Sequence, residues 1–167
     1  KYLSPFEVKA KMRTDKGQYW WELRVCAYYD EFEKEKIVWP ETSFDNQFCY
    51  VEKGVYLNKT SFFIPVSDHF LIGLLNSRMA KFYFGSIVSK MRGGYFSMSK
   101  AYVETFIVLN EEFINQQIIS IVHQILKSKK ISPSADTTAL ESQIDQLVYK
   151  LYGLTEEEID IIENSVK

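Results

Sequence analysis

Short runs of aromatic and β-branched residues dominate the first 66 positions of the chain. Such runs, bounded by glycine and proline, are typical of β-strands. A turn at Glu52-Lys53-Gly54 separates two of the shorter runs, so we expect a β-hairpin there. The runs cover residues 18–29, 36–39, 48–51, 55–57 and 60–65.

After Ser67 the apolar residues recur at intervals of three and four, which is the helical period. We expect one helix over about residues 68–85, capped by Ser67 or Asp68. The helix leads into Arg-Gly-Gly-Tyr-Phe at residues 92–96, whose paired glycines predict a loop or tight turn that can approach another surface closely. Residues 102–109 are expected to be extended.

Two apolar stripes at helical spacing follow, over residues 111–130 and 138–151. The short linker between them predicts an αα-hairpin. A short acidic helix is expected after residue 155. Two pairs have capping-box spacing, Thr138 with Glu141 and Thr155 with Glu158.

These segments predict an α+β fold. It comprises a small twisted β-sheet lobe with a packed helix, followed by a C-terminal α-helical hairpin and a short acidic helix. We expect the β-rich lobe to span residues 1–109 and the helical hairpin residues 110–167.

Composition agrees with a folded domain, because 46% of the 167 residues are apolar and 16% are aromatic. A chain of about 150 residues buries roughly two-thirds of its unfolded surface. Disordered, collagen-like and purely coiled-coil classes are therefore excluded. No apolar stretch approaches the roughly 20 residues that span a bilayer, and no signal peptide is visible. We expect no membrane partner, a cytoplasmic location and, since position 1 is Lys, a domain cut from a longer chain.

The net charge of -2 hides an asymmetry along the chain. Residues 1–100 carry 15 basic and 11 acidic side chains, a net charge of +4, whereas residues 101–167 carry 5 and 11, a net charge of -6. Residues 69–103 contain five basic side chains and no acidic one. A basic stretch joined to an acidic tail fits a protein with one surface that faces an anion. A solvated face that happens to lack acids is the alternative.

Motifs for catalysis are missing from the sequence. It contains no GxGxxG, GxxxxGK[ST], HExxH or GxSxG pattern and no Asn/Asp-Pro-Pro-aromatic tetrapeptide. His69 and His123 fall on different predicted helices and are expected to be structural. A complete active site, and with it a self-sufficient enzyme, is not expected.

Several segments in a fixed order add a more specific signal. They are residues 36–41 (Lys-Ile-Val-Trp-Pro-Glu), 61–64 (Ser-Phe-Phe-Ile), 71–77 (Leu-Ile-Gly-Leu-Leu-Asn-Ser), 82–84 (Phe-Tyr-Phe), 92–96 and the closing run 135–155. Their order and spacing resemble the TaqI-like C-terminal specificity domains of type IIG restriction-modification enzymes and N6-adenine DNA methyltransferases. The chain is also similar to the target-recognition domains of type I specificity subunits.

This resemblance implies a domain that reads double-stranded DNA and presents the target to an adenine methyltransferase domain upstream in the same polypeptide, sometimes with a nuclease domain. The neighbouring domain would flip an adenine out of the duplex, and this chain would do no chemistry alone. No cofactor is implied for this domain. S-adenosylmethionine and Mg²⁺ would belong to the other domains.

DNA-contacting residues are expected around the 92–96 turn. Arg92 would bind a phosphate or a guanine, and Tyr95 would pack on a sugar or base. A purely structural turn with Tyr95 in the core is the alternative. Neighbouring lysines would position the duplex through phosphates. The candidate set is Lys36, Lys59, Ser61, Lys90, Arg92, Gly93, Gly94, Tyr95 and Lys100.

A different class of function stays open on the sequence alone. The chain would then be a non-catalytic scaffolding module that docks a protein partner through its helical hairpin, and its basic stretch would be incidental. One contiguous positive face that holds Lys90, Arg92 and Lys100 would favour DNA. Scattered lysines would favour the scaffold.

Overall fold

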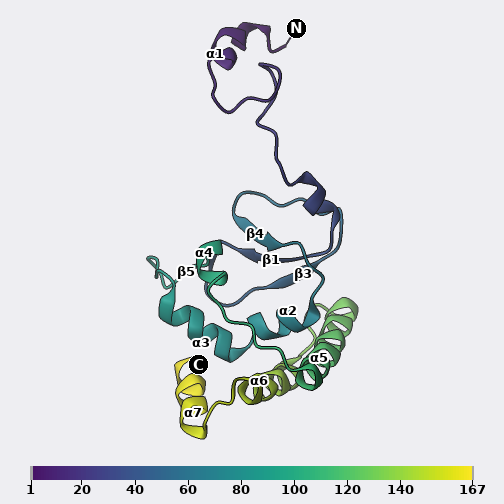
Figure 1. Ribbon diagram of the computed structural model, residues 1–167, viewed down its shortest axis with the longest axis vertical. Coiled ribbons are helices and arrows are strands. Elements are labelled where there is room, and N and C mark those ends of the chain that lie inside the picture. Colours follow the sequence, from purple (N-terminus) through teal and green to yellow (C-terminus); the bar gives the residue numbers. More distant parts are fainter. Residues whose placement is uncertain (1, 167) are drawn as a thin grey trace.

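The computed structural model describes residues 2–166 and has a mixed α+β architecture, as the sequence predicts (Figure 1). A small antiparallel sheet, a central helix and a pair of long helices lie in succession, and the N-terminal segment extends away from them. Within residues 2–166, no helix combines the length and the apolar character needed to cross a membrane.

Three strands form the main sheet in the order β3-β1-β4. They are β1 (Lys36–Pro40), β3 (Cys49–Val51) and β4 (Ser61–Ile64). Ile37 at the centre pairs with Tyr50 on one side and Ile64 on the other. The strands expected at 36–39, 48–51 and 60–65 are thus confirmed. The expected hairpin is wrong, because residues 55–57 form no strand and β3 pairs with β1 instead.

A second, two-stranded sheet pairs β2 (Thr42–Ser43) with β5 (Phe96–Ser97). Each strand has two residues, too few to leave a pattern in the sequence. The extended segment expected at 102–109 is partly wrong, since α4 (Lys100–Val103) occupies its start. Residues 106–110 then cross to the C-terminal helices without regular structure.

The N-terminal segment contains a 3₁₀ turn, η1 (Ser4–Phe6), the short helix α1 (Glu7–Lys11) and a second 3₁₀ turn, η2 (Tyr29–Glu33). The strand expected at 18–29 is wrong. The backbone turns there, with Glu22 N–H donating to the Tyr19 carbonyl at 3.1 Å. Tyr19 and Trp21 stack on each other with ring centroids 4.8 Å apart, so the aromatic side chains pair locally instead of forming a sheet.

Two helices replace the single helix expected over 68–85. They are α2 (His69–Leu75), capped by the predicted Asp68, and α3 (Arg78–Ile87), capped by Ser77. The Asn76 side chain between them donates to the carbonyls of Phe48 and Ile72 at 2.8 and 3.0 Å. Tertiary hydrogen bonds therefore stabilise a break that the continuous apolar period conceals.

The C-terminal helices are α5 (Glu112–Ile131), α6 (Thr138–Tyr152) and α7 (Glu156–Ser165). α5 and α6 lie side by side and confirm the αα-hairpin (Figure 1). The capping box of Thr155 and Glu158 is confirmed. The box expected at Thr138 is wrong, because α6 begins one residue after Thr137, whose hydroxyl donates to Glu141 instead.

One hydrophobic core joins the sheet, α2 and the C-terminal helices. α2 packs between the sheet and the α5–α6 pair. Gly73 makes this approach close, since a Cβ at that position would lie 2.7 Å from Ile118 of α5. The division at residues 109 and 110 stays a prediction about domain organisation.

Candidate nucleic-acid interface

The turn between α3 and β5 is exposed and well ordered by backbone hydrogen bonds. Met91 N–H donates to the Tyr95 carbonyl at 2.7 Å, and Gly94 N–H donates to the Met91 carbonyl at 3.2 Å. Gly93 and Gly94 have φ angles of +89° and +84°, which side-chain-bearing residues rarely adopt. The two glycines therefore set the turn, and Arg92 lies exposed within it.

Two cations of this turn have no counter-ion among the residues that the structure describes, 2–166. Over residues 2–166, neither Lys90 nor Arg92 forms an ion pair or a side-chain hydrogen bond. Both are exposed. Their charges are thus available to an anionic partner.

Lys59 and Ser61 lie at the same end of β1 as this turn. Ser61 pairs with Pro40, the last residue of β1, and Glu41 N–H donates to the Thr60 carbonyl at 2.9 Å. The Glu41 carbonyl accepts from Met98 N–H at 2.7 Å, which connects this end to the residue after β5. We call this end of the molecule, comprising residues 42–44, 59–61 and 90–100, the recognition edge.

Lys100 begins α4 on the recognition edge and is exposed. It pairs with Glu104 at 3.2 Å. Both side chains are more than 60% exposed, so this pair is weak and opens at little cost. When this ion pair opens, the charge of Lys100 adds to those of Lys59, Lys90 and Arg92.

Lys36 lies apart from the other candidates. It is fully buried at the start of β1, and its ammonium donates to the carbonyls of Phe32 at 2.9 Å and Glu52 at 3.4 Å. A buried ammonium needs such acceptors. The geometry gives Lys36 a structural role and leaves it no route to a duplex.

Acidic side chains neutralise two further basic residues of the acid-free stretch. Arg78 pairs with Asp145 and Glu163 of the C-terminal helices, and Lys81 pairs with Asp45 at 2.8 Å. Part of the acidic tail therefore balances charge within the fold. The unpaired charge of residues 69–103 is concentrated on the recognition edge.

Sequence reasoning missed Phe44, which follows β2 directly. Its ring lies against that of Tyr95 with centroids 3.6 Å apart. The pairing of Ser43 with Phe96 brings the two rings together across β2 and β5. Tyr95 is 37% exposed and Phe44 55% exposed, so neither ring belongs to the core.

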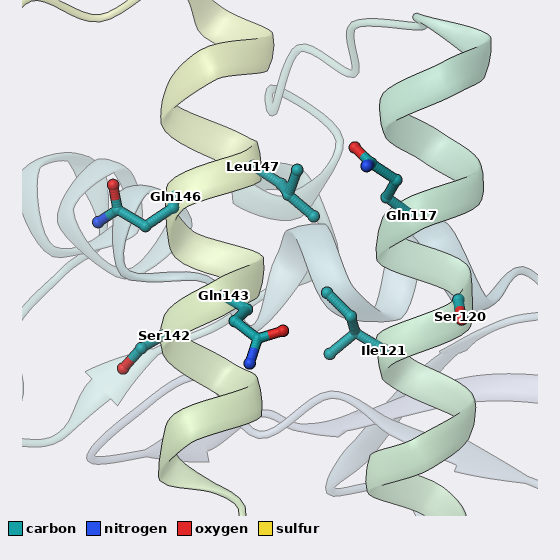
Figure 2. Close-up of a pocket in the computed structure, with 7 residues that line it drawn as sticks. All are labelled: Gln117, Ser120, Ile121, Ser142, Gln143, Gln146 and Leu147. Carbon is teal, nitrogen blue, oxygen red and sulfur yellow. The ribbon is translucent and has the colours of Figure 1, made fainter.

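The requirements of a metal site can be compared with residues 2–166, and those of a catalytic site with the groove between the two long helices. Over residues 2–166, no group of three His, Cys, Asp or Glu residues is placed to hold a metal ion. The groove between α5 and α6, about 600 Å³ in volume, is lined by amides, hydroxyls and two aliphatic side chains (Figure 2). Its lining has no acid, base or nucleophilic thiol. The lining residues are Gln117, Ser120, Ile121, Ser142, Gln143, Gln146 and Leu147.

A known protein family matches the part of the chain that carries this exposed basic edge. The family model described as the TaqI-like C-terminal specificity domain matches residues 1–108. The matched residues include the whole sheet, α2, α3 and the recognition edge, whereas the closing run at 135–155 lies outside the match. Because the match covers well over half of the 167 residues, the chain belongs to the family of TaqI-like C-terminal specificity domains.

Proposed function

We propose that this chain reads a short sequence in double-stranded DNA as the specificity part of a restriction-modification enzyme. An adenine methyltransferase domain of the same polypeptide, with or without a nuclease domain, would act on the target that this chain selects. Those domains would bind S-adenosylmethionine and Mg²⁺, and the work would take place in the cytoplasm. The chain itself would contribute binding and positioning.

The observation that carries the proposal is the turn at residues 90–95, which lies inside the family match. It presents two unpaired cations on a rigid backbone. A guanidinium such as that of Arg92 has the paired donors that match O6 and N7 of guanine in the major groove. Lys90 and Lys59 would contact phosphates and fix the register of the domain on the duplex.

The small number of free cations sets the expected strength of binding. Each phosphate that is neutralised adds about 0.9 to the salt slope of binding. Three edge lysines on phosphates, Lys59, Lys90 and Lys100, would give a slope of roughly three. Binding by this chain is therefore expected to be modest and salt-sensitive, with the neighbouring domain supplying the rest of the clamp.

Selection from a pool of randomised duplexes tests the proposal. The 167-residue chain, in low salt, should enrich one short motif. Arg92→Ala should weaken binding to that motif between about fivefold and 150-fold, as loss of one base contact does. Its unfolding midpoint should stay unchanged, since the exposed Arg92 side chain forms no hydrogen bond or ion pair with residues 2–166.

Lys130→Ala is the matched control, because it removes one exposed positive charge from α5, on the side of the molecule away from the recognition edge (Figure 1). It should change neither affinity nor stability. If no motif is enriched even after the upstream part of the polypeptide is restored, the recognition function is excluded. Parallel loss of affinity and stability in Arg92→Ala would instead assign the turn a structural role.

A further inference from the structure

The Phe44–Tyr95 contact places two aromatic rings on the outside of the molecule. Phe44 is 55% exposed, and Met91, whose backbone N–H donates to the Tyr95 carbonyl, is 48% exposed. Water is a poor environment for such apolar surface. The sequence neighbours of the two rings are less exposed, since Ser43 is buried and Phe96 is half-buried. The two exposed rings therefore lie directly beside inward-facing positions of β2 and β5.

Both rings are held on short, fixed segments. The Ser43 hydroxyl donates to the Asp45 carbonyl at 2.6 Å and accepts from Asp45 N–H at 3.2 Å, which closes the backbone around Phe44. Asn46 then anchors this segment by donating to the Leu75 carbonyl at 2.8 Å. The Phe44 ring is therefore presented by a rigid turn.

Tyr95 is held from the other side of the pair. Its carbonyl accepts from Met91 N–H, and the ring lies over Gly93, where an added Cβ would sit 3.6 Å from the ring carbons. That distance is ordinary van der Waals contact, so the Tyr95 ring packs closely on the backbone of the turn. Gly93 is required for the positive φ of the turn that carries Tyr95.

Charge around the rings identifies the kind of partner. The unpaired cations Lys90 and Arg92 come from the same turn as Tyr95. The acid closest in sequence to Phe44, Asp45, is already paired with Lys81. Rings beside free cations fit a partner that carries flat apolar faces next to negative charges. A nucleobase beside its phosphates has this chemistry.

We infer that Phe44 and Tyr95 form a stacking platform for a base that is unstacked from its neighbour in the bound duplex. This inference rests on the proposed function and adds a second mode of contact to it. Cations of the edge hold the phosphates, and the platform stabilises a distortion of the base stack. Sequences whose steps unstack easily would then be favoured without a hydrogen bond to the base.

A fluorescent base analogue tests the platform. The probe is a duplex of the sequence enriched in the selection, with 2-aminopurine substituted at one position at a time, because its emission rises when it leaves the stack. The 167-residue chain should raise the emission at one position. Phe44→Ala should abolish that rise and weaken binding between about fivefold and 150-fold, the range for one stacked base.

Three variants separate stacking from packing. Tyr95→Phe should keep the emission rise, since the ring remains. Phe44→Leu keeps an apolar side chain of similar bulk and loses the π face. If the ring acts by stacking, the emission rise should be lost in this variant. If it acts only by packing, the rise should be retained. Phe113→Ala, which removes an exposed ring from α5, should leave binding unchanged.

Two results overturn the inference in distinguishable ways. The platform is excluded, and DNA recognition is left intact, if the wild-type chain binds the duplex with no emission rise at any position. The same conclusion follows if Phe44→Ala and Phe44→Leu both retain the rise. Failure of the wild-type chain to bind any duplex excludes both the platform and the proposed function.

Discussion

The backbone N–H of Arg78 donates to Oδ1 of Asp145 at 2.8 Å, although 67 positions separate the two residues. The Arg78 Nε also lies 3.4 Å from the second carboxylate oxygen. Arg78 is the first residue of α3, so Asp145 of α6 accepts from an amide that has no partner within the helix. The negative carboxylate also interacts favourably with the positive end of the α3 dipole. This contact fixes the family-matched part of the chain to the C-terminal hairpin.

Loss of this carboxylate should destabilise the protein. Asp145→Ala leaves the Arg78 amide without its acceptor and removes an ion pair, so we expect the free energy of unfolding to fall by about 1–3 kcal/mol. Asp145→Asn should cost less, because its amide oxygen can still accept from Arg78. Urea unfolding measures both. Asp160→Ala, at an exposed position of α7, is the control and should have no effect. Equal stability of all three variants would contradict the coupling.

Gly73 and Gly85 give a matched pair for the packing of α2. A Cβ at Gly73 would lie 2.7 Å from Ile118 and 3.0 Å from Val122, whereas a Cβ at Gly85 meets nothing within 4 Å. Gly73→Ala should therefore lower stability by about 1–3 kcal/mol through overpacking. Gly85→Ala should raise it by up to about 1 kcal/mol, since alanine is the better helix former. Thermal unfolding of both variants measures the two effects. A Gly73→Ala variant as stable as the wild type would contradict the close packing of α2 on α5.

Strong, local patterns were sufficient to predict the main elements of the fold. The strand at Lys36–Pro40 and the helix at Glu112–Ile131 have apolar residues at the period that their burial requires. The break between α2 and α3 has no such signal, because contacts with Phe48 and Asp145, in distant parts of the chain, stabilise it. The strand predicted at residues 18–29 is absent because aromatic residues, which are frequent in strands, also stack on one another within a turn.

The candidate site was predictable only in part for a similar reason. A cation in a glycine-rich turn, such as Arg92, can be identified from sequence. Burial of Lys36 depends on carbonyls from two other segments, and the pairing of Phe44 with Tyr95 depends on two-residue strands. Long-range geometry determines both, and no local pattern encodes it.

Replacement of single lysines should separate the recognition edge from the core. Lys90→Met should lower the salt slope of DNA binding by about one, because one phosphate contact is lost. Lys36→Met removes a charge of the same kind from a buried position and should leave the slope unchanged. Fluorescence anisotropy over a series of salt concentrations gives both slopes. A lower slope in Lys36→Met than in the wild type would place Lys36 at the DNA.

His69 should make stability depend on pH. Its ring lies 4.5 Å from that of His123 and 5.3 Å from that of Tyr50. Burial, followed by repulsion from His123, lowers the pKa of His69, while Asp68 and Glu35 partly oppose the shift. A base with a lowered folded pKa stabilises the fold above its unfolded pKa of about 6.5, and this contribution disappears as pH falls through the folded pKa.

Unfolding midpoints in urea between about pH 8 and pH 5 should therefore be level at the alkaline end and fall below about pH 6.5. His69→Phe keeps an aromatic ring against Tyr50 and cannot be protonated, so its midpoint should fall less over the same interval. His123→Gln removes the repelling neighbour and should also reduce the decline, because the pKa of His69 then moves toward its ordinary value. Identical slopes in the wild type and His69→Phe would show that other groups cause the acid sensitivity.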